Sequence, residues 1–582
     1  MSYLYAGTIR SWQGLALAGV SLTVYTDSAG TVEADLTDSG GTAIDNPTTT
    51  DDRGRVEVYS ASPTLWYKVA GDTRVMRLVR FCDLVQGFVS GLPWFNVMDY
   101  GALGNGSHDD TDAIKAALAA AEGGQLYFPP GDYGWSATMF IPPKTTLIGV
   151  PGQSILTRIG EPSDWSAFLE MTCFSNVNWY ADTDTDIHIY GLSCRWAEDS
   201  PEPHTTSGGG GFVVLHNVDR FSVDHCEAFN SNESNIFAYD CHHGTITDNY
   251  IHGFADTGIG LSDCTDVVVS NNVLVDGGDG INVYAAAAAV VNGSYTTPAL
   301  SSDIIISGNT VRIMYSLGIE AGDGGSDADS SRYVVNNNAV DDCNNGIIVS
   351  GNDISVVGNV VHEPGSTGIW LHPANTTYSS RSCARISVVG NIVSGYDTDL
   401  VNKGSGILVG ADYNYSAALT DVVIANNTVA DAAYDGIRVR ARGASAAFSH
   451  LVIEGNILSG CGRYVDAYSG SGNFYGAYLL VGSGGTLAHI AIRGNKMHDA
   501  KGTKTQRGFA IDGAGCTGFI VTGNDVDNTC YVSGSGHTIE GNIGTALGEL
   551  AVTGARDDGT ALASLLTQLA ALGIITDSST AT

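Results

Sequence analysis

A repeated unit between Gly211 and Asn542 constrains the fold of this chain more than any other feature. Each repeat begins with an apolar residue, two variable residues, Asn, one variable residue and a second apolar residue, as in Ile246–Ile251 and Val269–Leu274. The second half of the repeat is a Gly-apolar-x-apolar segment, such as Gly258–Leu261. Two short apolar segments per repeat, separated by turns, predict strands that stack repeat upon repeat into a parallel β-helix.

The Asn of the first half recurs at variable spacing. Cys226, Asn249 and Asn272 are 23 residues apart, whereas Asn272 and Asn309 are 37 residues apart. A constant motif at variable spacing predicts a coil of constant cross-section with loops of different length. Strands in register stack about 4.8 Å apart, so Asn side chains of successive turns can hydrogen-bond along the axis. We therefore predict that these Asn residues are structural, including Asn338, whose repeat fits less cleanly, with Cys226 in place of one Asn.

Differences in residue pattern along the sequence divide the chain into four parts. Residues 1–90 alternate apolar and polar residues in short runs and predict a small antiparallel β-domain. Residues 91–140 lead into the coil and contain an Ala-rich helix, for which Asp109–Asp112 offers N-cap residues. Residues 141–545 are the β-helix, and residues 546–582 contain Leu at three- and four-residue spacing, which predicts an amphipathic helix. Because a solenoid needs its ends covered, we expect these two helices to be its caps.

The chain is strongly acidic, with a formal net charge of −35. Such a charge repels nucleic acid and anionic membranes, so neither is expected as a partner, and it keeps a long β-solenoid soluble. The eleven Cys have no zinc-type spacing, and no metal site is expected from them. The start of the chain lacks the basic and apolar segments of a signal peptide, which indicates synthesis in a reducing cytoplasm with mostly buried thiols.

Residues 95–133 resemble the pectate-lyase superfamily of right-handed β-helix proteins. The residues that carry the resemblance are Asn96–Ala102, Asp109–Ile114 and Leu126–Tyr133. The resemblance implies an all-β chain with a right-handed single-stranded coil over about residues 94–545. The sequence has neither the paired Asp-Asp with downstream Gly-His-Gly and Arg-x-Lys of polygalacturonases nor the calcium-and-arginine set of pectate lyases, so no catalytic residue is transferred by motif.

The two flanks resemble parts of phage tail spikes. Residues 1–90 are similar to the small β-domain that anchors such proteins to the virion, and residues 545–582 are similar to the end of phage receptor-binding proteins. This resemblance implies a homotrimer in the virion tail, held by a tail or baseplate protein through residues 1–90. It also implies synthesis in the host cytoplasm and action outside the host cell, on a bacterial surface polysaccharide.

The second halves of successive repeats predict a surface for this function. In a Gly-apolar-x-apolar strand the apolar residues point inward and x points outward, so stacking places the x residues in one column. Carboxylates, aromatic rings and amides together suit a sugar chain, because rings stack on sugars and paired carboxylates supply an acid and a base. We expect Glu320 to be catalytic together with Asp279 or Asp323. The expected substrate-binding residues are Asn282, Tyr284, Trp370, His372 and Arg438.

Each of these residues also has a simpler interpretation. Glu320 can be a solvated side chain, Asp279 a turn residue, and the loop of Asp323 a solvated segment or a weak structural Ca²⁺ site. Trp370 can contact a saccharide or a neighbouring subunit, and Arg438 a subunit or an acidic sugar. Three functions follow: a glycoside hydrolase that needs no cofactor, which we favour; a polysaccharide lyase; and a non-catalytic adhesin. A rigid spacer is the structural alternative.

Overall fold

In the computed structural model the chain forms two compact units, residues 1–93 and residues 94–582. In the first unit the structure describes the strands named below and residues 33–35 and 45–47. In the second unit it describes residues 94–542 apart from gaps at 161–171, 179–182, 197–210, 232–233, 285–289, 292–293, 296–300, 323–330, 374–382, 397–403, 411–416, 443–445, 463–473, 482–484, 499–505, 514, 527–530 and 533–534. The helix expected within residues 546–582 lies outside the described residues.

The first unit consists of two antiparallel sheets. One sheet has the order β1 (Tyr3–Thr8), β6 (Arg55–Ser60), β3 (Leu36–Thr37) and β4 (Ala43–Ile44). The other has the order β5 (Thr48–Thr49), β2 (Ser21–Tyr25), β7 (Leu65–Val69) and β8 (Met76–Leu78). The side chain of Asn46 holds β2 to the neighbouring turn, because it accepts a hydrogen bond from the Val24 N–H at 2.9 Å and donates to the Val24 and Ala34 carbonyls.

The second unit begins with β9 (Trp94–Asn96), the 3-10 helix η1 (Val97–Tyr100), β10 (Asn105–Asp109) and α2 (Thr111–Ala120). α2 is the only α-helix in the described part of the chain, and it buries Ile114, Ala117 and Leu118 in the same core as the first rungs. No helix among these residues is long and apolar enough to cross a membrane.

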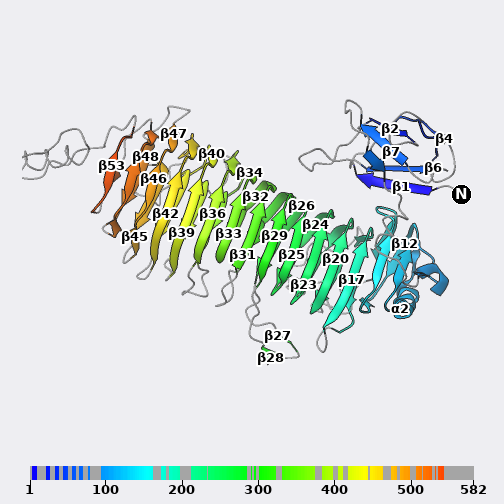
Figure 1. The fold of residues 1–582 in the computed structure, drawn as a ribbon. Helices are drawn as coiled ribbons and strands as arrows, with labels where there is room; N and C mark the ends of the chain where they lie inside the picture. Colours follow the sequence, from blue (N-terminus) through cyan, green and yellow to red (C-terminus); the bar gives the residue numbers. More distant parts are fainter. Residues whose placement is uncertain are drawn as a thin grey trace, which may run out of the picture. The chain divides into compact units, whose positions relative to one another are not determined.

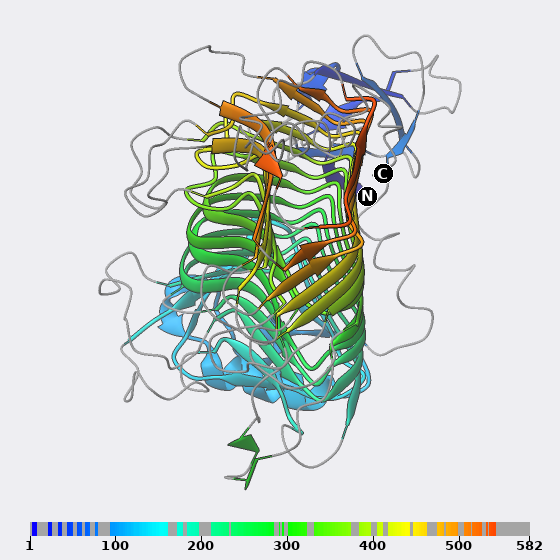
Figure 2. The ribbon, with the colours of Figure 1, turned by 90° about the vertical axis from the view of Figure 1, so that its left-hand side faces the viewer.

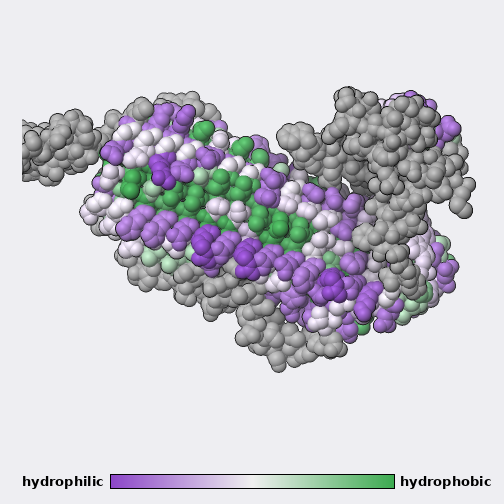
Figure 3. Space-filling model, in the orientation of Figure 1, coloured by the Kyte–Doolittle hydropathy of each residue, from purple (hydrophilic) through white to green (hydrophobic). Residues whose placement is uncertain are grey.

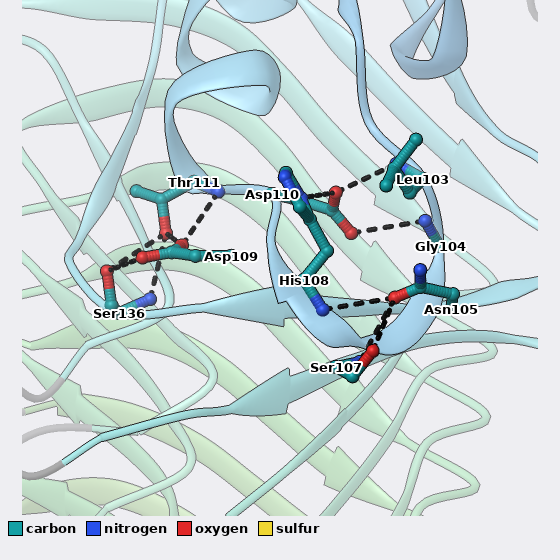
Figure 4. A network of polar contacts seen from close by, with 9 residues as sticks. All are labelled: Leu103, Gly104, Asn105, Ser107, His108, Asp109, Asp110, Thr111 and Ser136. Atoms are coloured by element: carbon teal, nitrogen blue, oxygen red, sulfur yellow. Dashed lines mark hydrogen bonds and ion pairs between the residues drawn. The ribbon is translucent and has the colours of Figure 1, made fainter.

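An acidic loop fixes the start of α2 (Figure 4). The buried carboxylate of Asp110 accepts hydrogen bonds from the backbone N–H groups of Leu103 at 2.8 Å and Gly104 at 3.1 Å, and lies 2.9 Å from His108 Nδ1. Asp110 occupies the N-cap position, but its side chain makes no capping hydrogen bond to the helix. Asp110 therefore stands at the expected N-cap position, but its carboxylate accepts hydrogen bonds from the preceding loop and not from the helix.

Most of the following rungs contain one strand of sheet 1, a turn, and two strand segments of sheet 2 that meet at a corner (Figures 1 and 2). After β42 (Ala447–Glu454) the sheet 1 strand of a rung is divided into two short strands, both of which pair with β42. The order of sheet 1 after β9 is β11 (Gln125–Phe128), β14 (Thr146–Gly149), β17 (Asp184–Tyr190), β20 (Val218–Asp224), β23 (His242–Thr247), β25 (Thr265–Ser270), β29 (Ser302–Ser307), β31 (Ser331–Asn336), β33 (Asn352–Val357), β36 (Cys383–Val389), β39 (Ala418–Ala425), β42 (Ala447–Glu454), β45 (Thr486–Ala488), β46 (Ala491–Arg493), β49 (Cys516–Thr517), β50 (Ile520–Thr522) and β53 (Thr538–Glu540).

Sheet 2 contains β10 and all remaining strands of the coil. They are β12 (Gly131–Trp135), β13 (Met139–Ile141), β15 (Ser154–Arg158), β16 (Phe174–Asn176), β18 (Ser193–Arg195), β19 (Val213–His216), β21 (Glu227–Ser231), β22 (Ile236–Tyr239), β24 (Tyr250–Ser262), β26 (Val273–Tyr284), β30 (Thr310–Ala321), β32 (Ala339–Val349), β34 (Val360–His362), β35 (Ile369–Leu371), β37 (Ile392–Ser394), β38 (Ile407–Gly410), β40 (Thr428–Ala430), β41 (Ile437–Ala441), β43 (Ile457–Ser459), β44 (Phe474–Val481), β47 (Lys496–His498), β48 (Gln506–Asp512), β51 (Asp525–Val526) and β52 (Tyr531–Val532). In the loop after β26, β27 (Val290–Val291) and β28 (Ser294–Tyr295) form a hairpin. The strand pairs of the coil are parallel, which confirms the predicted all-β parallel β-helix.

The Asn residues form a continuous ladder inside the turn between the two sheets. From Asn272 to Asn542, the Oδ1 atom of each Asn accepts two hydrogen bonds from the Asn one rung before it. One comes from the backbone N–H and the other from Nδ2, at 2.8–3.0 Å. Cys226 stands at the head of the ladder, and its N–H donates to Asn249 Oδ1 at 2.9 Å. Asn338 takes part like the others. The prediction that these residues are structural is confirmed.

Candidate functional site

The structure places four of the expected site residues in one column on the second segments of sheet 2. Register pairs run from Asn282 to Glu320, then through Ile348 to Trp370, and through Leu408 to Arg438. We call this the outward column. Because neighbouring strands lie about 4.8 Å apart, Glu320 is about 10 Å from Trp370 and about 19 Å from Arg438 along the axis. Asn282 and Glu320 are half-buried neighbours in adjacent rungs.

Asp279 lies at the corner of the rung of β26, three residues before Asn282. Burial raises the pKa of Asp279, and the nearby Asp256 carboxylate raises it further, while hydrogen bonds from the Ser316 side chain and the Leu317 backbone lower it. Among the described residues, no group donates a hydrogen bond to Asp279 Oδ1, which is buried. A carboxyl group in such surroundings holds its proton at a higher pH than an ordinary Asp does.

Two β-bulges shape the corner around Asp279. The pairing of β24 with β26 runs from Phe254–Gly277 to Thr257–Asp279, so β24 has one more residue than β26 in this interval. The pairing of β26 with β30 continues from Gly277–Met314 to Asp279–Leu317, so β30 also has one more residue. Bulges re-aim side chains and occur often next to active sites.

The bulges bring residues to Asp279 that the sequence analysis did not select. Asp256 acts on Asp279 from one side, and Ser316 hydrogen-bonds to it from the other. Asp256 in turn accepts a hydrogen bond from Ser234 Oγ at 3.2 Å. Tyr315, in the bulge of β30, is the most exposed large side chain on this corner. The two carboxylates and the hydroxyl groups form a site we call the acidic corner, made of Ser234, Asp256, Asp279 and Ser316.

Trp370 lies on the next part of the outward column, and His372 follows it two residues later, beyond the end of β35. Trp370 Nε1 donates to the Gly410 carbonyl at 2.6 Å, and the two rings are 4.4 Å apart between centroids. Burial lowers the pKa of His372 to about 4, so its imidazole is neutral at pH 7. A saccharide or a second subunit was expected as the partner of Trp370. Its indole N–H group already has a hydrogen-bond partner within the chain, because the next rung places the Gly410 carbonyl within reach.

Arg438 at the end of the column is held by residues of its own chain. Its Nε lies 2.6 Å from Asp435 Oδ2, and its guanidinium lies 5.2 Å from the ring centroid of Tyr434 and 5.8 Å from that of Tyr478. Asp435 is 1% exposed and Arg438 is 15% exposed. The buried carboxylate therefore balances the charge of Arg438, which remains at the surface only in part.

Two expected site residues cannot be placed from side-chain geometry. Asp323 and its loop, including the proposed Ca²⁺ alternative, lie outside the described residues. Tyr284 ends β26, and its side chain also lies outside the described part. A different group, Asp341, His362 and Glu363, has ligand atoms within 4.8 Å of one another, but it is a largely exposed set to which we assign no metal.

Comparison with known proteins agrees with this architecture. Residues 94–298 match the family model described as rhamnogalacturonase A/epimerase, pectate lyase-like. The parallel sheets define the second unit as a parallel β-helix, and residues 94–298 of it are similar to pectate lyase-like proteins.

The relatives compared by sequence match about a third of this chain or less. Alginate lyase 7 of Azotobacter vinelandii is 26% identical over 213 residues, which are 34% of this chain and 24% of that protein. Mannuronan C5-epimerase AlgE3 of the same organism is 57% identical over 42 residues, 7% of this chain and 2% of that protein. The chain thus matches about a quarter or less of the length of these relatives. A solved tailspike protein of E. coli bacteriophage HK620, in complex with a pentasaccharide, has a TM-score of 0.46 at 13% identity, covering 76% of this chain and 80% of that chain.

Proposed function

We propose that this protein binds a bacterial surface polysaccharide, such as a capsule, O-antigen or exopolysaccharide, and hydrolyses it with two carboxylates. The observation that carries the proposal is the raised pKa of Asp279 in the acidic corner, beside the outward column that contains Glu320. A general acid needs a raised pKa, and burial beside a second carboxylate raises the pKa of Asp279. The names of the relatives, an alginate lyase and mannuronan epimerases, support a polysaccharide as substrate.

The roles of the residues follow from their positions. Asp279 donates a proton to the leaving glycosidic oxygen, and Glu320 is the second carboxylate, which activates water or attacks the sugar. Asn282, paired in register with Glu320, hydrogen-bonds to a sugar hydroxyl. Trp370 and Arg438 on the continuation of the same column contact further sugar residues, as do His372 and Tyr284, and Asp323 is the alternative to Asp279 as the partner of Glu320.

Elimination is the second candidate reaction, and the alginate lyase among the relatives favours it. An eliminating enzyme needs a base next to a uronic acid whose carboxylate is neutralised. The guanidinium of Arg438 is already paired with Asp435 and lies about 19 Å from Glu320 along the column. Hydrolysis therefore agrees better with the arrangement of charges, and a non-catalytic adhesin would use the same surface without the chemistry.

The assembly is part of the proposal. We propose a homotrimeric tail spike, anchored to the phage tail or baseplate through the first unit, on the strength of the resemblance of the flanks. An exposed apolar stripe supports contact between copies: Val360, Ile392 and Ile457 lie in one column and are 42%, 45% and 44% exposed. Thr428 lies between Ile392 and Ile457 in this column. Figure 3 shows an apolar stripe between hydrophilic bands on the face of the coil that is seen in Figure 1. A second copy of the coil presents the same order of side chains at the same spacing.

One assay tests the reaction. The purified protein is incubated with capsular polysaccharides, O-antigens and exopolysaccharides, and reducing ends and the ultraviolet absorbance of unsaturated products are followed. New reducing ends without absorbance show hydrolysis, and a rise of both shows elimination. Binding without either identifies an adhesin, and the absence of binding and cleavage for the whole panel contradicts the proposed function.

A further inference from the structure

Tyr315 is 71% exposed, the highest value among the exposed large apolar and aromatic side chains of the described residues. It is nevertheless held in place. Its hydroxyl donates to the carbonyl of Ala255, which lies in β24, two rungs away from β30. The ring therefore spans the intervening rung of β26 and keeps a fixed orientation at the surface.

The rung beneath Tyr315 is built to let the ring cross it. β26 has Gly277 and Gly278 at this place, where the neighbouring rungs have bulges. A Cβ atom on Gly278 would lie 2.4 Å from the Asp256 carbonyl oxygen and 2.9 Å from the Tyr315 hydroxyl oxygen. The absence of a side chain at Gly278 is thus a requirement for the observed position of Tyr315.

The backbone is strained in β30, the strand that contains Tyr315. Ile313, two residues before Tyr315, has φ of 60° in the left-handed region. The residues at the equivalent corner of nearby rungs are Gly253, Asp276, Asp342 and Glu363. A β-branched residue in this region is unfavourable and persists where the surrounding structure imposes it, often at binding and catalytic sites.

The chemistry around the ring points to a ligand class. The exposed face of an aromatic ring packs on the C–H face of a pyranose, and carboxylates accept hydrogen bonds from sugar hydroxyls. Asp256 follows Ala255, whose carbonyl accepts a hydrogen bond from the Tyr315 hydroxyl. Besides Asp279, which is the proposed proton donor, Asp256 and Asp276 place two carboxylates on this corner. Their charges repel an anionic sugar and leave a neutral sugar residue as the fitting occupant.

We propose that Tyr315 is the stacking platform of a subsite for a neutral sugar residue at the acidic corner, with Asp256 as hydroxyl acceptor. The inference rests on the proposed function and adds a position to it, since the sugar bound on Tyr315 lies next to Asp279. Polysaccharides that carry a neutral residue next to the cleaved bond are then the preferred substrates.

The test uses the full-length protein on a microarray of bacterial capsular polysaccharides, O-antigens and exopolysaccharides that includes alginate. Three variants are compared: Tyr315→Leu, which keeps apolar bulk, Tyr315→Phe, which keeps the ring, and Trp94→Ala, which removes a 48% exposed aromatic ring on β9 of sheet 1. Thermal melting verifies that each variant is folded. We expect Tyr315→Leu to lose affinity about tenfold or more, Tyr315→Phe to stay within about threefold, and Trp94→Ala to bind as the wild type.

The outcomes separate the two proposals. If the wild type binds a glycan and Tyr315→Leu binds it equally well, the subsite is wrong while the proposed function stands. An equal loss in Tyr315→Phe and Tyr315→Leu also overturns the platform, because the hydroxyl anchor alone would then matter. Binding only to glycans without neutral residues contradicts the ligand class. If the wild type binds nothing on the array, the proposed function fails, and the subsite with it.

Discussion

Asn282 and Glu320 are register partners in adjacent strands, which places an amide and a carboxylate at neighbouring positions of the outward column. Asp279 precedes Asn282 by three residues on the same strand and lies at the corner of the rung. The candidate acid and its partner carboxylate thus come from adjacent rungs, and the spacing between them is set by the stacking of the coil.

The first prediction concerns these two carboxylates. Glu320→Gln and Asp279→Asn keep the size of the side chains and remove the proton-transfer groups, so each is expected to lower the rate of reducing-end release by about 100-fold or more, with binding retained. Glu454→Gln serves as the matched control, because Glu454 lies on β42 in sheet 1 and pairs with Arg493. Full cleavage by Glu320→Gln would show that our assignment of the second carboxylate is wrong.

The second prediction concerns pH. Because the pKa of Asp279 is raised in the folded protein, its ionisation opposes folding. The stability is therefore expected to fall as pH rises from the ordinary pKa of Asp, about 3.9, through the raised folded value. Asp279→Asn removes this penalty, so its melting temperature should exceed that of the wild type at pH 7 and approach it at pH 4.

Cleavage should show the matching dependence. If Asp279 is the proton donor, kcat of the wild type decreases as pH rises through the raised pKa, because the acid is then deprotonated. A melting curve of Asp279→Asn that equals that of the wild type at pH 7 would mean that Asp279 is not destabilised in the folded state.

The coil and its register could be predicted from the repeat, because an apolar residue that is one position out of phase would point away from the core. Asn338 illustrates this, since its repeat is irregular but the stacking forces it into the ladder. The acidic corner was not predicted from the sequence, because it depends on two bulges. A bulge appears in a sequence only as a difference in length between neighbouring rungs and not as a motif. The signal was present: nine residues separate Asn249 from Gly258, eight separate Asn272 from Gly280, and nine separate Asn309 from Gly318.

Hydrogen-bond partners were harder to predict than positions. The outward direction of Trp370 follows from the alternation along the strand, but the contact of its Nε1 with Gly410 depends on the rotamer and on the next rung. In the same way, Arg438 was expected to bind a ligand, and no sequence pattern indicates that the nearby Asp435 is buried and pairs with it.

The third prediction concerns the ladder. Asn427 is buried, accepts two hydrogen bonds from Asn391 and donates from Nδ2 to the Val388 carbonyl and to Asn456. Asn427→Ala leaves several buried polar groups without partners, and we expect a loss of about 3 kcal/mol in the free energy of unfolding. The neighbouring Asn426 is exposed with φ of 55°, so Asn426→Gly should change stability by less than about 0.5 kcal/mol. Urea unfolding of both variants measures the difference, and equal midpoints would contradict a structural role for the ladder.

The fourth prediction concerns assembly. If the apolar stripe is the contact between copies, a charge in its centre must be desolvated on association, and this is unfavourable. Ile392→Lys and Ile457→Lys are therefore expected to shift the mass measured by light scattering from three chains to one. Ile305→Lys is a control at a similar exposed fraction, 39%, on β29 of sheet 1, outside the column of Ile392. Each variant exposes its substituted side chain to water in the single chain, so its melting temperature at low concentration should stay near that of an unassembled wild-type chain. A trimer that persists in both Ile392→Lys and Ile457→Lys would exclude this column as the subunit contact and leave the polysaccharide-binding surface unaffected, because the two surfaces use different strand segments of each rung.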